Sequence, residues 1–139
     1  MTLQETINKL LEIGSKQHNI NYVGEGDIYT LNSIPNINYS VFFITQQQHQ
    51  QSENTITYNL YLYYIDRLTN KEENRTQIQS NGIVMLGNIV NTFINEVDDA
   101  QLNYSITYQP FTHKFADMCA GVYGIVSITL DNGLGVCNY

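Results

Sequence analysis

Alternating side chains dominate one stretch of the chain, Thr55 to Ile65, with the sequence TITYNLYLYYI. Successive side chains of a strand point to opposite faces, and β-branched and aromatic residues favour strands. One face of this strand is almost wholly apolar, from Ile56 to Tyr64, whereas the other mixes hydroxyl and aromatic groups and includes Tyr61 and Tyr63. The pattern predicts a central strand with helices over its apolar face and a second face that is half-wetted or forms a subunit contact.

Two segments have the apolar spacing of amphipathic helices. Thr2 and Glu5 have the spacing of a capping box, so a helix is expected to begin there. Its apolar stripe consists of Leu3, Ile7, Leu10 and Leu11. A second helix is predicted from Arg75 to Val97. Its stripe consists of Ile78, Met85, Leu86, Ile89, Val90, Phe93 and Val97, widened by Ile83, Val84 and Ile94. Gly82 and Gly87 within it predict close approach to the sheet or to another helix.

Further strands are predicted on either side of the second helix. They span Ile37 to Thr45, Leu102 to Tyr108 and Val122 to Leu130, with a short edge strand near Asp27 to Leu31. Pro110 is expected to end the strand before it. The order helix, strand, strand, helix, strand, strand predicts a single α+β domain over residues 1–139. Its mainly antiparallel sheet would have about four to five strands, with both helices packed on one face.

A polar connector, QQQHQQSEN, joins the first of these strands to the central strand. We expect residues 46–54 to form the long tip of an antiparallel hairpin, solvated in the free protein and able to order against a neighbour. The apolar connector from Phe111 to Met118 either folds back on the core or docks on a partner.

The charge balance narrows the classes of partner. Six Lys and Arg stand against 13 Asp and Glu, which gives a net charge of -7. That sign disfavours gripping nucleic-acid phosphates, but an acidic wall around DNA would leave the DNA mobile. Only 14% of residues are charged, and the chain has 11 Tyr. This composition resembles that of interfaces and indicates assembly, or else it reflects the composition that the source favours.

The start of the chain has no basic segment followed by an apolar one, and no apolar run of about 18 residues occurs. We therefore expect a soluble protein that is made in the cytosol and does not enter a membrane. Cys119 and Cys137 are expected to be two free thiols, with a disulfide between them as the less favoured alternative.

No pattern of catalytic or metal-binding residues stands out. His18, His49 and His113 are isolated, so we expect neither a metal nor a cofactor. Cys119, His113 and Asp117 form a set of residue types found in cysteine enzymes, but residues this close in one loop rarely orient a base toward a nucleophile. The sequence predicts that the protein is not an enzyme.

Two segments carry a resemblance to a known family. They are TYNLYLYYIDRLTNKEENRTQIQSNGIVMLGNIVNTF, from Thr57 to Phe93, and YQPFTHKFADMCAGVYGIVSI, from Tyr108 to Ile128. Over about half of its length the chain resembles small neck proteins of tailed bacteriophages, none of whose matching parts is a catalytic motif. The likeness is greatest to ring proteins of crAss-like phages and related prophages of gut Bacteroidetes, of the tail-terminator or tail-completion type.

The resemblance implies a structural virion protein, made in the host cytoplasm and located in the neck or tail. It would form a closed 12-fold or 6-fold ring with itself, contact adjacent neck, portal or tail proteins, and surround DNA without sequence-specific binding. The residues expected at subunit contacts are Gln46, Gln47, Gln48, His49, Tyr61, Tyr63, Phe111, Phe115 and Met118. The alternatives are a small ligand-binding or adaptor module, with the Tyr-rich face as a pocket floor, and an enzyme using Cys119 and His113.

Overall fold

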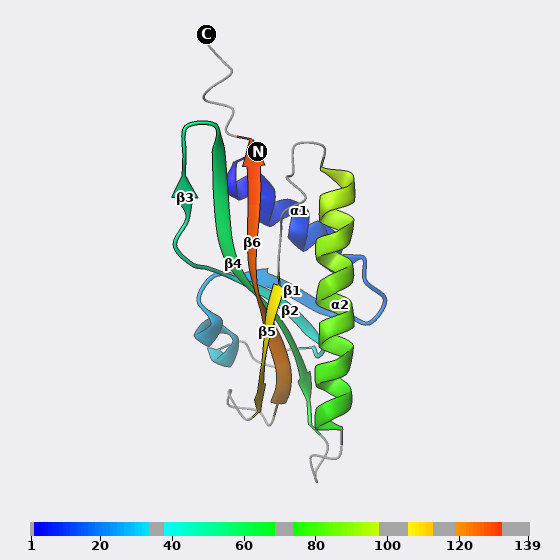
Figure 1. Ribbon diagram of the computed structural model, residues 1–139. Helices are drawn as coiled ribbons and strands as arrows, with labels where there is room; N and C mark the ends of the chain where they lie inside the picture. Colours follow the sequence, from blue (N-terminus) through cyan, green and yellow to red (C-terminus); the bar gives the residue numbers. More distant parts are fainter. Residues whose placement is uncertain (1, 34–37, 69–73, 98–105, 113–118, 132–139) are drawn as a thin grey trace.

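The computed structural model describes residues 2–33, 38–68, 74–97, 106–112 and 119–131 (Figure 1). Within these residues, two α-helices and a 3-10 helix accompany six strands. They are α1 (Leu3–Ser15), β1 (Tyr22–Glu25), η1 (Ile28–Ser33), β2 (Val41–Gln46), β3 (Gln50–Gln51), β4 (Thr55–Arg67), α2 (Arg75–Glu96), β5 (Ile106–Thr112) and β6 (Cys119–Asp131). The predicted α+β class is confirmed, with a mixed sheet that is mostly antiparallel.

The strand predicted to be central occupies the middle of the sheet. The strand order is β1-β2-β4-β6-β5, and the short β3 also pairs with β4. β4 runs antiparallel to β6 over its whole length, from the pair Thr55 and Asp131 to the pair Arg67 and Cys119. Among the described strands, β1 and β2 are the one pair that runs in parallel. β4 is therefore the middle strand of the described order, with β2 and β6 beside it and β1 and β5 at the edges.

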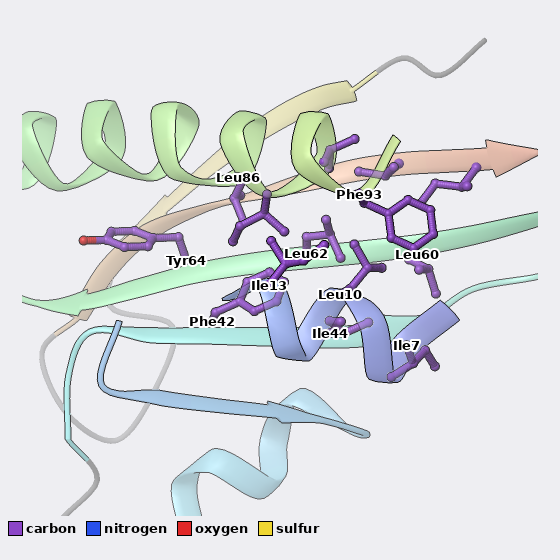
Figure 2. Packing of buried hydrophobic residues seen from close by; sticks show 14 of the residues in the cluster. Ile7, Leu10, Ile13, Phe42, Ile44, Leu60, Leu62, Tyr64, Leu86 and Phe93 are labelled. Atoms are coloured by element: carbon purple, nitrogen blue, oxygen red, sulfur yellow. The ribbon is translucent and has the colours of Figure 1, made fainter. Parts of the chain in front are cut away.

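Helix α2 lies along the apolar face of the sheet, as predicted (Figures 1 and 2). Its Leu86 and Phe93 are buried with Leu60, Leu62 and other β4 residues in the main core. A Cβ atom built on Gly82 would lie 2.5 Å from Cγ1 of Val122, which confirms the close approach expected there. At Gly87 the nearest atom, Oη of Tyr108, is 3.5 Å away, an ordinary contact.

Helix α1 begins with the predicted capping box and packs beside α2. The Thr2 backbone N–H donates to Oε1 of Glu5 at 2.9 Å, and the Glu5 N–H donates to Oγ1 of Thr2 at 3.1 Å. Leu10 is fully buried in the main core. Nζ of Lys9 lies 2.8 Å from Oε1 of Glu96, which links α1 to the end of α2. The two helices share one face of the sheet.

The edge strand expected near Asp27 to Leu31 is wrong in position. β1 lies at Tyr22–Glu25, and Gly26, with φ of +130°, turns the chain out of the sheet. The next residues form η1, where Ile28 and Leu31 are three residues apart and lie on one side of a 3-10 helix. This side covers the face of the sheet opposite α2, so these two residues are buried there rather than paired in a strand.

Two details of the second half also differ from expectation. Pro110 lies within β5 rather than after a strand, because β5 is an edge strand that pairs only with β6 among the described strands. In α2, Ile94 is buried as predicted, but Ile83 and Val84 are 43% and 61% exposed and do not widen the buried stripe. Leu102 to Ser105 of the predicted strand lie outside the described residues.

Candidate subunit interface

The face of the sheet opposite α2, here called the far face, is partly covered by η1. Ile28 and Leu31 form a second core cluster with Tyr63 and with Val41, Phe43, Ile65 and Cys119. Tyr63 is only 4% exposed, so the ring that alternation placed on a half-wetted face lies inside the subunit. Among the described residues, the far face is exposed at Ile125, which η1 does not cover.

A group of aromatic rings marks the boundary between the covered and open parts. The rings of Tyr61 and Tyr123 stack with centroids 5.1 Å apart, and Tyr123 and Tyr63 are also 5.1 Å apart. Phe111 of β5 lies 6.2 Å from Tyr63. Tyr61, Tyr123 and Phe111 are each half-buried. The boundary is therefore a layer of aromatic rings in mutual contact.

The Gln-rich connector pairs with β4 at Gln46, Gln50 and Gln51, so the tip of the hairpin is shorter than predicted. Residues 46–48 and 50–54 are exposed to solvent, as expected. After the pair Gln46 and Leu60, the next pair is Gln50 and Thr57, which leaves three residues opposite two. That count defines a β-bulge at residues 47–49. The turn itself is short, because the Ser52 N–H donates to the Thr55 carbonyl at 2.8 Å.

Asn59 of β4 holds the bulge in place through its backbone and its side chain. Its carbonyl accepts from the Gln47 N–H at 2.9 Å, and its N–H donates to Nδ1 of His49 at 3.1 Å. Its side-chain Nδ2 donates to the Gln48 carbonyl at 2.6 Å, and its Oδ1 accepts from Oγ of Ser127 at 2.5 Å. The bulge is thereby bonded across β4 to β6.

These contacts also assign a role to His49. Since Nδ1 accepts a hydrogen bond, the neutral ring carries its proton on Nε2, which lies 3.2 Å from Oε1 of Gln46. His49 also meets the Tyr58 ring edge-on, with centroids 5.4 Å apart. His49 therefore supports the bulge, and the exposed amides of Gln47 and Gln48 are the groups presented to solvent.

The exposed part of this arrangement is an uncharged surface that we call the open patch. It surrounds a hollow on the far face lined by Gln47, Gln48, Asn59, Tyr61 and Ile125. Tyr61 and Ile125 are paired across β4 and β6, and Ile125 is 38% exposed. The absence of charge together with a partly exposed Tyr ring is typical of the central parts of protein contact surfaces. A neighbouring hollow of about 500 Å³ extends to Gly26, Asp27 and Ile28 and shares Gln47 and Tyr61 with the open patch.

The structure brings together four of the residues predicted at subunit contacts. Gln46, Gln47 and Gln48 lie beside Tyr61 at the two neighbouring hollows. His49 and Tyr63 serve the fold, and Phe111 lies at the other end of the aromatic group. Phe115 and Met118 lie outside the described residues.

Asn59 and Ile125 were missed by the sequence interpretation. Their positions in the alternation of two paired strands were the available signal, but the register between those strands was needed to use it.

The described residues offer little for chemistry. No three His, Cys, Asp or Glu side chains gather among them in a group that could hold a metal ion. Cys119 is fully buried, and His113 and Asp117 lie outside the described residues. Burial raises the pKa of the Asp66 carboxyl, against the opposing effect of the hydrogen bond from the Arg67 N–H. None of the described helices is long and apolar enough to cross a membrane.

Comparison with known proteins adds no assignment. No protein-family model matches the chain, and the comparison with curated proteins finds no match. The case for a function therefore comes from the geometry and from the two segments that carry the resemblance.

Proposed function

We propose that this chain is a structural subunit of a ring in the neck or tail of a tailed bacteriophage. In that ring, copies of the chain stand side by side around the DNA channel, between the portal complex and the tail. The likeness of residues 57–93 and 108–128 to neck ring proteins suggests this role. The α+β fold with two helices on one face of the sheet is compatible with a tail-terminator-like architecture.

The observation that carries the proposal is the open patch. Its Gln47, Gln48, Tyr61 and Ile125 are uncharged, and hydrogen bonds through Asn59 hold the bulge in one shape. A preformed patch loses little entropy when a partner covers it. Such a surface suits a contact that is repeated many times in one particle.

The acidic net charge of the chain is consistent with DNA passing through the proposed ring without being bound. The net charge of -7 repels the phosphate backbone, so a channel through such subunits would not hold DNA by counterion release. DNA would then move through the ring without sequence-specific contacts.

Quantitative mass spectrometry of purified virions tests this function. With an isotope-labelled copy of the chain as standard, we expect 6 or 12 copies per particle for one ring. Disrupting the gene should leave heads and tails unjoined, and a plasmid copy should restore joining. Particles that lack the chain but are complete and infectious would contradict the proposal.

A second candidate function is favoured by the hollow between η1 and the bulge. About 500 Å³ in volume and lined by Asp27, Thr45, Tyr61 and Tyr63 among others, it has the size of a small-molecule site. A binding module would be monomeric and would show saturable shifts of nuclear magnetic resonance (NMR) signals from these residues with one class of compound. The absence of such shifts across a fragment library would reject it.

A further inference from the structure

The outer surface of α2 carries no charge along nearly its whole length. Between Arg75 and Glu96 no residue of the helix is charged, and its exposed positions are occupied mainly by Asn, Gln, Ser and Thr. The other helix differs, because α1 and its cap carry Glu5, Glu12 and Lys16 on the surface. Depletion of charge is a feature of the central parts of protein interfaces.

Two large apolar side chains stand on this surface. Ile83 is 43% exposed and Val84 is 61% exposed. Both are β-branched and are weaker helix formers than Ala, so neither propensity nor burial in the subunit explains their presence. Adjacent exposed apolar residues of this kind mark contact sites more often than isolated ones do.

A groove lies beside these residues, between α2 and the edge strand β5. The helix groove, as we call it, has a volume of about 340 Å³ and is lined by Thr76, Gln79, Ser80, Ile83, Tyr108, Pro110 and Val122. Oη of Tyr108 donates to the Ile83 carbonyl at 3.3 Å, and Nε2 of Gln79 donates to the Phe111 carbonyl at 3.3 Å. These bonds tie helix to strand, so the groove is preformed.

The helix groove and the open patch lie on opposite sides of the sheet. α2 packs on the face that contains Leu60 and Leu62 (Figure 2). Tyr61, which lies between them in β4, belongs to the opposite face. We propose that the helix groove with Val84 binds the open patch of the next copy of this chain. This inference rests on the proposed ring function and assigns the two surfaces that meet in it.

Charge is the reason for choosing a second copy as the occupant. Two copies that each carry a net charge of -7 repel each other, and this repulsion opposes a close contact least where acidic side chains are absent. The helix groove and the open patch both meet this condition. A basic partner would instead be drawn to the acidic parts of the surface.

Different surfaces that bind head to tail also have a geometric consequence. A contact between the groove of one copy and the patch of the next leaves one groove and one patch unoccupied after every addition. Such heterologous contacts end only when the rotation closes a ring. The placement of the two surfaces on opposite sides therefore suits the proposed function.

Val84→Glu and Ile125→Glu test the pairing, because each adds a charge at an exposed position on one of the two surfaces. Asn8→Glu adds the same charge at an exposed position of α1 and is the control. Circular dichroism and thermal melting check that each variant folds. Native mass spectrometry then counts copies for wild type, for each variant, and for an equimolar mixture of Val84→Glu with Ile125→Glu.

We expect rings from wild type and from Asn8→Glu, and monomers from each of the other two variants alone. The mixture should form 1:1 dimers, because one variant keeps an intact open patch and the other an intact helix groove. Rings from either variant alone, or monomers in the mixture, would overturn this pairing of surfaces. If wild type still formed rings in that case, the proposed function would stand. Wild type that stays monomeric at high concentration, both alone and with phage portal and tail proteins, would overturn both.

Discussion

The backbone N–H of Asn59 donates to Nδ1 of His49 at 3.1 Å, so an imidazole ring supplies the acceptor at a bulge in the sheet. The next pair on either side of the bulge is made by backbone alone, at Leu60 with Gln46 and at Thr57 with Gln50. This bond fixes where Gln47 and Gln48 emerge beside Tyr61. The shape of the open patch thus depends on a side chain that is not part of it.

Replacing His49 should loosen the bulge. In His49→Ala the Asn59 N–H loses its acceptor, and we expect faster hydrogen exchange at that amide and a loss of about 1 kcal/mol in the free energy of unfolding. Gln51→Ala, at an exposed position of β3, is the control and should change neither quantity. Unchanged exchange at Asn59 in His49→Ala would show that the bond does not hold the bulge.

The two glycines of α2 should respond to alanine with opposite signs. In Gly82→Ala the new methyl group meets Val122 Cγ1 at 2.5 Å and Tyr64 Cδ2 at 2.9 Å, so overpacking should cost about 1–3 kcal/mol. Gly87→Ala meets only Oη of Tyr108 at 3.5 Å and should gain up to about 1 kcal/mol from helix propensity. Denaturant unfolding measures both, and equal effects would contradict this packing of α2.

Tyr61 and Tyr63 are two residues apart but should differ in what they support. Tyr63 is 4% exposed, so Tyr63→Ala should cost about 3–5 kcal/mol of stability. Tyr61 is half-buried at the open patch, so Tyr61→Ala should destabilise the subunit less and weaken self-association more than its stability loss explains. Unfolding curves and analytical ultracentrifugation separate the effects. A Tyr61→Ala protein that assembles like wild type would count against the patch.

Asp66 should make the subunit less stable at neutral pH than in mild acid. Burial raises the pKa of its carboxyl above the ordinary value of 3.8, so the folded state binds this proton more tightly than the unfolded state. The protonated carboxyl contributes to the free energy of unfolding, and this contribution is fully present below pH 3.8. It is lost as the pH rises through the folded-state pKa. In wild type the Arg67 N–H donates to Oδ1 of Asp66 at 2.8 Å. In Asp66→Asn the amide oxygen can still accept this hydrogen bond.

The variant should therefore gain stability relative to wild type at pH 7 and show no gain at pH 3. Urea unfolding at the two pH values measures the difference. Parallel changes in the two proteins would mean that Asp66 is not the group responsible.

Periodicity predicted the elements in which apolar side chains recur regularly over many residues. β4 and α2 have long, regular apolar patterns, and both were placed within a residue or two of their observed ends. β1 and η1 were misplaced because Gly26 turns the chain and a 3-10 helix has no distinctive pattern over six residues. Tyr63 was assigned to a half-wetted or subunit-contact face because its burial depends on η1, which is distant in sequence.

The candidate interface was predictable only in part. The Gln-rich segment and Tyr61 stood out by composition, but the bulge depends on which residue of β4 faces His49. The register of β4 with β6 likewise brings Ile125 to Tyr61. Pairing across a sheet is a property of the folded chain, and alternation within one strand does not contain it.

The central claim is that this chain assembles into a closed ring, and native mass spectrometry with negative-stain microscopy tests it most directly. The purified wild-type chain should be measured at rising concentration, alone and with phage portal and tail proteins as the proposed neighbours. The account predicts a single closed species of 6 or 12 copies with a central hole. Monomer alone under every one of these conditions would contradict it.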